Sequence, residues 1–208
     1  MSYLSLSDET VTEQTIEKSR FIATSCHIEG EEEAKAFIER VKSKYRDATH
    51  NCYAYIADDK GNFLRFSDDG EPQGTAGMPM LEVLKANNLK QVAVVVTRYF
   101  GGIKLGAGGL VRAYSGAVAQ NVAAAKRVTY EQCVKSGYEV DYTQTDLCQR
   151  FFSSNDCTLI DTVYADKVTF IVAIKKEQEQ DFNSRLTDRL NGKVKIDKLE
   201  EYLFPFEV

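Results

Sequence analysis

Glycine is concentrated in one part of this 208-residue chain. Ten of the thirteen glycines lie between Gly61 and Gly116, whereas the last 75 residues contain only Gly137 and Gly192. Glycine adopts backbone angles that other residues avoid, and it leaves room for another backbone to approach closely. We therefore expect the first part of the chain to contain loops whose backbone conformation requires glycine. We expect the second part to consist of ordinary strands and helices.

The first glycine-rich segment is residues 66–77, which we call the acidic loop. It combines three glycines and a proline with the carboxylates of Asp68, Asp69 and Glu71. Three carboxylates within four residues can bind Mg²⁺. They can also form a turn in which aspartate side chains accept hydrogen bonds from their own backbone. Both interpretations stay open: these residues order the loop, or they are possible metal ligands.

The second segment lies in a part of the chain that contains no acidic residue. The chain carries 26 Lys and Arg and 31 Asp and Glu, which gives a net charge of −5. All the charged residues between positions 83 and 130 are nevertheless Lys or Arg. There are seven of them: Lys85, Lys90, Arg98, Lys104, Arg112, Lys126 and Arg127. A mildly acidic protein thus contains one locally basic segment, which is typical either of an anion-binding surface or of a buried strand and an Ala-rich helix that need few charges.

Within this basic segment, residues 101–109 form what we call the glycine loop. A buried strand leads into it, and a helix follows it, so its backbone N–H groups and the helix dipole favour an anion. The loop lacks the Walker A pattern. It also departs from the dinucleotide-binding pattern G-x-G-x-x-G, because Val111 occupies the position of the last glycine. We expect contact with an anion or a partner surface through these residues: Arg98, Tyr99, Gly101, Gly102, Lys104, Gly106, Gly108, Gly109 and Arg112. The alternative is that the glycines only let the helix pack close to the sheet.

The periodicity predicts two α+β domains, residues 1–132 and 133–208. In the first we expect strands over residues 11–16, 21–27, 52–57 and 91–97, and helices over 31–45, 78–87 and 109–126. In the second, strands over 133–140, 158–164, 168–174 and 193–202 alternate with helices over 145–154 and 177–190. This βαββαβ order is the ferredoxin-like arrangement.

Several function classes are disfavoured by the sequence. The longest apolar run has five residues, whereas a membrane helix needs roughly 20. The first ten residues resemble no export signal, and five scattered cysteines suit reduced thiols, so we expect a cytoplasmic protein. Cys26-His27 and His50-x-Cys52 lack the usual metal-ligand spacing, and we expect no bound cofactor.

The two loops resemble the IMPACT/YigZ family. The residues that carry the resemblance are SDDGEP-x-GTAG-x-P at 67–79 and VVVTRYFGG-x-KLG-x-GGL-x-RAY at 94–114, with KSRFI at 18–22 and HNC-x-AY at 50–55 as further matches. The resemblance implies a ribosomal-protein-S5-domain-2-like first domain and a ferredoxin-like second domain of the bacterial members. It also implies a role near translation, since the eukaryotic relatives regulate the amino-acid-starvation kinase by competing for its ribosome-bound activator.

We therefore expect a translation-associated regulator that binds RNA, the ribosome or a ribosome-bound protein through the basic glycine loop, without catalysis. Two alternatives stay open. One is a nucleotide-binding, phosphotransferase-like enzyme that uses the same loop. The other is a protein-interaction module with no affinity for polyanions.

Overall fold

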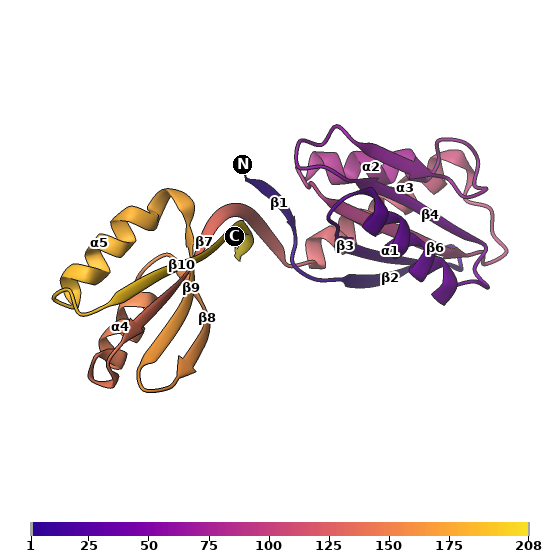
Figure 1. Cartoon of the computed structure of the whole chain (residues 1–208). Helices are drawn as coiled ribbons and strands as arrows, with labels where there is room; N and C mark the ends of the chain where they lie inside the picture. The colour runs from indigo at the N-terminus through magenta and orange to yellow at the C-terminus, as the bar shows by residue number, and fades with distance from the viewer. Residues whose placement is uncertain (1, 208) are drawn as a thin grey trace. The chain divides into compact units, whose positions relative to one another are not determined.

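A computed structural model describes residues 2–207 and divides them into two compact units (Figure 1). The amino-terminal unit is built on Tyr3–Thr129 and the carboxy-terminal unit on Tyr130–Phe206. Met1 and Val208, the outermost residues of the two expected domains, lie outside the described residues.

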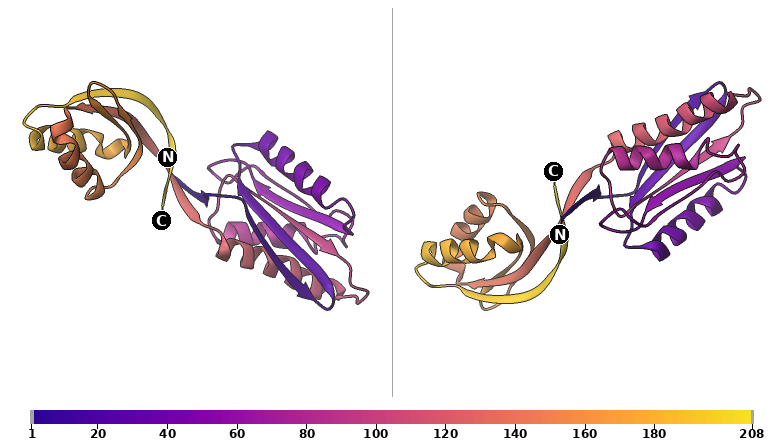
Figure 2. Two further views of the ribbon diagram at one scale, coloured as in Figure 1. Left: turned by 90° about the horizontal axis from the view of Figure 1, so that it is seen from below. Right: turned by 90° about the horizontal axis from the view of Figure 1, so that it is seen from above.

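The amino-terminal unit is a three-layer α/β/α structure. Its sheet has the strand order β2-β3-β6-β4-β5, with every neighbouring pair antiparallel. Helix α1 covers one face, and helices α2 and α3 cover the other (Figure 2). The elements are β2 (Thr10–Ile16), β3 (Ser19–His27), α1 (Glu31–Lys44), β4 (His50–Ile56), β5 (Leu64–Ser67), α2 (Gly77–Ala86), β6 (Val92–Tyr99) and α3 (Gly106–Ala124).

The central strand β6 explains the apolar run of the sequence. Val94 and Val96 pack toward α2 and α3, whereas Ala93 and Val95 pack toward α1. A strand that is buried on both faces loses the alternation of apolar and polar residues. The uninterrupted run at residues 92–96 is therefore a central strand between two cores.

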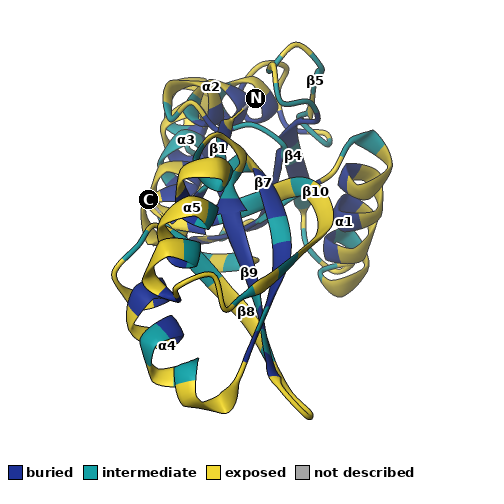
Figure 3. Ribbon diagram, turned by 60° about the vertical axis from the view of Figure 1, so that its left-hand side comes forward, coloured by how far each residue is buried: buried dark blue, intermediate teal, exposed yellow. Residues whose placement is uncertain are grey.

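Helix α1 is favoured both by its apolar stripe and by the charges at its two ends. Ala34, Phe37, Ile38 and Val41 recur at helical spacing, and they are the buried residues of the helix, on the side that faces the sheet in Figure 3. Three glutamates occupy its first turn and two lysines its last turn, which complements the helix dipole.

The carboxy-terminal unit has the βαββαβ order, and its strands lie in the order β10-β7-β9-β8. Its core is aromatic and joins the sheet to α4 and α5 through Tyr138, Phe152, Phe170 and Phe182. The elements are β7 (Arg127–Val140), η1 (Tyr142–Gln144), α4 (Thr145–Ser153), β8 (Cys157–Tyr164), β9 (Val168–Lys175), η2 (Lys176–Gln178), α5 (Glu179–Arg189) and β10 (Lys195–Glu207). The prediction of an α+β chain with a ferredoxin-like second half is confirmed.

Some element boundaries differ from those expected. Two four-residue strands were not predicted: β5, and β1 (Tyr3–Leu6). Strands this short carry too few alternating positions to stand out in a sequence. Helix α3 begins at Gly106, three residues before the expected start, because the first turn of a helix needs no helix-forming residue when its backbone is held by the rest of the fold.

Candidate binding site

The acidic loop is held by its own aspartates. The carboxylate of Asp68 accepts hydrogen bonds from the backbone N–H groups of Gly74, Ala76 and Gly77, at 2.8, 3.0 and 2.8 Å. These groups lie at the start of α2, so Asp68 supplies the acceptor and the negative charge that the beginning of a helix favours. The loop is thus ordered by backbone N–H groups donating to one carboxylate.

Asp69 ties the same loop to the rest of the unit. Its carboxylate accepts a hydrogen bond from the backbone N–H of Asn51 at 2.7 Å and forms an ion pair with Lys42 of α1 at 3.2 Å. Its φ of 44° lies in the left-handed region that short polar side chains tolerate. The Asp69 carbonyl in turn accepts from Nδ1 of His50 at 2.8 Å.

Glu71 points inward and meets Arg98. Their side chains are 3% and 6% exposed, and Nη1 of Arg98 lies 2.7 Å from Oε1 of Glu71. The same oxygen accepts a hydrogen bond from the Tyr114 hydroxyl at 2.7 Å. Burial raises the pKa of Tyr114 well above its ordinary value, with the neighbouring Cys52 and Glu71 adding to the effect, so the hydroxyl remains a donor.

The guanidinium of Arg98 is enclosed on its remaining sides. Nη2 donates to Ser19 Oγ at 3.3 Å, and the rings of Phe21 and Phe100 each lie 5.4 Å from its central carbon. In the sheet, Arg98 stands between Phe21 of β3 and His50 of β4. The expectation that Arg98 contacts an external anion does not fit this position, because a buried, paired guanidinium is not accessible to a partner.

The three carboxylates do not converge on one point. Asp68 faces backbone N–H groups, Asp69 faces Lys42, and Glu71 faces Arg98. Within residues 2–207, no group of three or more His, Cys, Asp or Glu side chains is placed to hold a metal ion. The contacts of these three side chains within residues 2–207 are those of a loop-ordering role.

Tyr99 is half-buried, and both its hydroxyl and its ring contact neighbouring side chains. Its hydroxyl donates to Asp47 at 2.9 Å, and the Arg20 guanidinium lies over its ring at 5.6 Å. One face of the ring is therefore already in contact with a cation. The exposed aromatic ring nearby is Phe100, with 46% of its surface accessible.

The glycine loop crosses the backbone of the β2–β3 turn. A Cβ built on Gly101 would lie 2.0 Å from the carbonyl carbon and oxygen of Lys18, so no other residue fits there. The N–H of Gly101 donates to Ser19 Oγ at 3.2 Å. Gly102 and Gly106 have φ values of 87° and 69°, which favour glycine.

The glycine loop ends at the start of α3. Gly106, Gly108 and Gly109 lie in the first turn, and the N-cap residue, Leu105, makes no side-chain hydrogen bond to it. The first N–H groups of a helix have no partner inside the helix. This helix end therefore offers free donors and the positive end of its dipole.

Beside this helix start lies a hollow of about 430 Å³, bordered by Lys104, Arg112 and Gly109, with Ile103 and Glu17 also on its wall. Lys104 and Arg112 are exposed, and neither forms an ion pair with any residue between 2 and 207. The structure thus brings together two of the three expected cations and separates them from Arg98. The result is a small, solvent-accessible site with two positive charges that have no ion-pair partner among residues 2–207.

Glu71, Arg98, Ser19 and Tyr114 form what we call the buried network. Sequence analysis did not assign a role to two of them, Ser19 and Tyr114. Both stand within the segments that carry the family resemblance. Their association with Arg98 and Glu71 depends on strands and a helix that are distant in the sequence. The available signal was their membership in these segments, because local periodicity gives no reason to select them.

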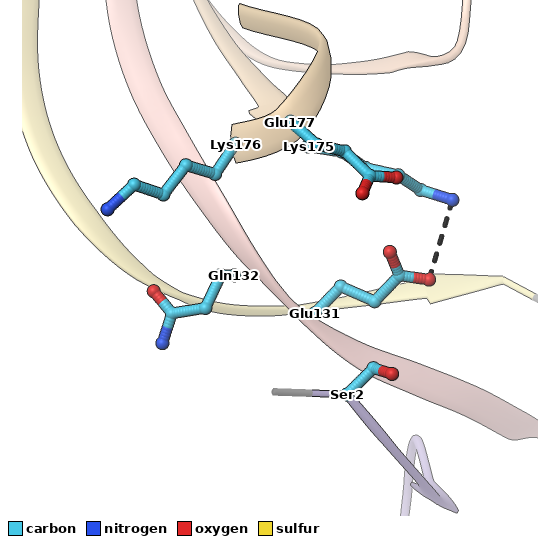
Figure 4. Close-up of a pocket in the computed structure, with 6 residues that line it drawn as sticks. All are labelled: Ser2, Glu131, Gln132, Lys175, Lys176 and Glu177. Carbon is cyan, nitrogen blue, oxygen red and sulfur yellow. Dashed lines mark ion pairs between the residues drawn. The ribbon is translucent and has the colours of Figure 1, made fainter.

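The carboxy-terminal unit has a hollow of its own, about 440 Å³, which Figure 4 shows. Its wall includes Glu131, Lys175, Lys176 and Glu177, and Nζ of Lys175 lies 3.4 Å from Glu131. Both lysines of this hollow are already paired, Lys175 with Glu131 and Asp156 and Lys176 with Glu201. No helix within residues 2–207 is both long and apolar enough to cross a membrane.

Comparison with known proteins places the chain in a family. The Impact N-terminal domain model matches residues 17–122, which include every residue of both loops, and the model named "Domain of unknown function (DUF1949)" matches residues 139–193. IMPACT family member YvyE of Bacillus subtilis is 38% identical over 94% of this chain and 90% of its own length. YigZ of Escherichia coli is 39% identical, over 92% and 95% respectively.

A solved structure agrees with this result. The crystal structure of a hypothetical protein covers 96% of this chain and 98% of its own, with 35% identity and a TM-score of 0.62. The chain therefore belongs to the IMPACT family, with an Impact N-terminal domain followed by a DUF1949 domain.

Proposed function

We propose that this protein is a translation-associated regulator that binds the ribosome, through RNA or a ribosome-bound protein, at the glycine loop. The observation that carries the proposal is the pair of exposed cations, Lys104 and Arg112, which have no ion-pair partner within residues 2–207 and lie beside the start of α3. Cations and free backbone N–H groups together suit phosphate groups or acidic side chains. The connection to translation comes from the family resemblance.

The buried network supports the proposal by fixing the loop. Glu71, Arg98 and Ser19 hold the backbone that leads into Gly101. A loop that is ordered before binding loses less conformational freedom on binding. In this scheme Arg98 is a positioning residue, and Lys104 and Arg112 make the contact.

Co-sedimentation with purified ribosomes over a series of salt concentrations tests the proposal. We expect binding to weaken with salt, since each neutralised phosphate releases a counterion. The double variant Lys104→Ala/Arg112→Ala should weaken binding and flatten the salt slope by about two units, one for each lost contact.

A matched control removes the same charge elsewhere. Arg150 and Lys193 are exposed side chains of the carboxy-terminal unit, so Arg150→Ala/Lys193→Ala should leave affinity and slope unchanged. Equal behaviour of the two double variants would contradict the proposal. Saturable binding of ATP that depends on Lys104 and Arg112, without ribosome binding, would favour the phosphotransferase-like alternative instead.

A further inference from the structure

The turn that connects β2 to β3 has an unusual backbone conformation. The two strands pair as far as Ile16 and Ser19, so the turn consists of Glu17 and Lys18 alone. Their φ values are 44° and 64°. A two-residue hairpin turn with positive φ at both positions favours asparagine and glycine. Glutamate and lysine are strained in this conformation, and strained residues are common at ligand-binding sites.

This turn is held on two sides. Gln14 of β2 donates a hydrogen bond from Nε2 to the carbonyl of Ala113 in α3, at 3.2 Å. On the other side, the glycine loop crosses the turn so closely that a Cβ on Gly101 would lie 2.0 Å from the carbonyl of Lys18. The turn therefore forms a fixed wall of the hollow that Lys104 and Arg112 border, and a fixed wall loses little conformational freedom on binding.

The hollow carries charges of both signs that are not paired with each other. Glu17 shares its wall with Lys104 and Arg112. All three side chains are exposed, and none forms an ion pair with a residue between 2 and 207. A carboxylate beside two cations repels a ligand that is only an anion. A ligand that suits all three side chains has an anionic group and, close to it, a hydrogen-bond donor.

The remainder of the wall is apolar. Ile16, Ile103, Leu105 and Ala113 contribute to it, and Ile103 is 37% exposed. These side chains suit the non-polar faces of a sugar and a base. The volume of about 430 Å³ lies in the range of sites that hold small ligands, so the hollow has room for one nucleotide.

We propose that this hollow binds one nucleotide of an RNA chain, with a phosphate at Lys104 and Arg112 and a ribose 2′-hydroxyl that donates a hydrogen bond to Glu17. In RNA this hydroxyl lies close to the phosphate, and it is the group that distinguishes RNA from DNA. The acidic side chains of a peptide bring carboxylates without a donor, and Glu17 repels them. Glu17 is then a specificity-determining residue. This inference deepens the proposed function by naming RNA as the ligand, and it rests on that proposal.

Fluorescence anisotropy on the full chain, at low and constant salt, tests the inference. The probe is a labelled oligouridylate RNA of about twelve nucleotides, within the usual range for single-stranded sites. An oligodeoxyuridylate of the same length lacks the 2′-hydroxyl, and a 2′-O-methyl oligouridylate lacks its proton. We expect RNA to bind about three- to tenfold more tightly than either, as suits one exposed hydrogen bond to a carboxylate.

Three variants separate recognition from folding. Glu17→Ala should bring the RNA and DNA affinities to within about twofold of each other, because the hydrogen bond and the repulsion disappear together. Glu39→Ala is the matched control: it removes an exposed carboxylate from α1, on the opposite face of the sheet from α3, and should preserve the preference for RNA. Glu17→Gly suits the left-handed backbone, so it should be at least as stable as the wild type and still lose the preference.

The inference is overturned if RNA does not bind saturably, if DNA or the methylated RNA binds as tightly as RNA, or if Glu17→Ala keeps the wild-type preference. Competition by an oligoglutamate peptide as effective as that by unlabelled RNA also overturns it and indicates a protein ligand. The two proposals fail separately. Ribosome binding that depends on Lys104 and Arg112 but is unaffected by Glu17→Ala, with no preference for RNA, removes this inference alone. A Glu17-dependent preference for RNA without ribosome binding removes the ribosome proposal alone.

Discussion

The acidic loop and the glycine loop of the amino-terminal unit are both rich in glycine and charge, but they use their charges in opposite ways. In the acidic loop, Asp68, Asp69 and Glu71 are each satisfied by donors of the same unit. In and just after the glycine loop, Lys104 and Arg112 remain exposed and unpaired within the described residues. The comparison teaches that a dense charged motif can be a structural brace in one place and an available surface in another.

Burial makes this difference. Glu71 and Arg98 are covered by α3 and by the aromatic rings of Phe21 and Phe100, so each charge requires the other. The side chains of Lys104 and Arg112 extend into solvent, where an unpaired charge costs little. Substitutions of these charged side chains should therefore change different properties, stability for Glu71 and Arg98 and binding for Lys104 and Arg112.

The largest effect is expected for Glu71→Gln. It leaves the buried Arg98 charge without its partner, which should lower the free energy of unfolding by about 3–5 kcal/mol. Urea unfolding followed by circular dichroism measures the loss, and hydrogen exchange assigns it to the amino-terminal unit. The exposed carboxylate variant Glu82→Gln is the control and should leave the midpoint nearly unchanged. A wild-type midpoint for Glu71→Gln would mean that the acidic loop is no brace.

Gly101→Ala should have the next largest effect. Its Cβ would collide with the backbone of Lys18, and overpacking of this kind costs about 2–3 kcal/mol. Gly108, in the first turn of α3, is the matched control, because its Cβ would lie at an ordinary contact distance, 3.7 Å, from Nη1 of Arg112. Gly108→Ala should be neutral or stabilise by a few tenths of a kcal/mol. Thermal unfolding compares the two, and similar values would show that the close approach at Gly101 is not needed.

Asp68→Ala should cost about 2 kcal/mol, because the N–H groups of Gly74, Ala76 and Gly77 lose one charged acceptor. Asp68→Asn keeps an acceptor oxygen and should recover part of the loss. Chemical denaturation of the three proteins gives the order wild type, Asn, Ala. If the two variants were equally unstable, the negative charge would matter more than the hydrogen bonds.

The smallest effect concerns pH and lies away from both loops. Burial lowers the pKa of His27, against a smaller opposite effect of Glu33. The unfolded chain therefore binds a proton at His27 more readily than the folded chain does. The stability contributed by neutral His27 is complete above about pH 6.5 and is lost as the pH falls below this value.

We expect a modest decrease in unfolding midpoint between pH 7.5 and pH 5.5, and His27→Gln should reduce this decrease. The comparison requires unfolding curves of both proteins at the two pH values. A variant with the full wild-type pH response would place its origin in another group, with the acidic loop as the next region to test.

Much of the architecture follows from the sequence. The stripe of Ala34, Phe37, Ile38 and Val41 marks α1, and the apolar run at 92–96 marks the central strand. The βαββαβ order of the second half is also visible, because each of its elements is long enough to show its period. The short strands β1 and β5 are not, since four residues fit many patterns.

The sequence also indicates that the two loops are special, from glycine spacing and from the absence of acidic residues between 83 and 130. What it does not determine is the direction in which each charge points. In the sequence, Arg98, Lys104 and Arg112 are three cations with no sign of which is buried. Arg98 is buried because β6 pairs between β3 and β4 and because Glu71 and Tyr114 arrive from elsewhere in the chain to meet it.

Local periodicity thus determined the helices and most strands, and glycine spacing located the acidic loop and the glycine loop. These features depend on neighbours within a few residues. Only the tertiary structure decided that Arg98 braces the fold while Lys104 and Arg112 face solvent. The physical reason is that the environment of a charge is set by residues distant in sequence, such as Ser19, Glu71 and Tyr114 around Arg98. The free energy of burying a charge depends on those partners and not on the residue itself.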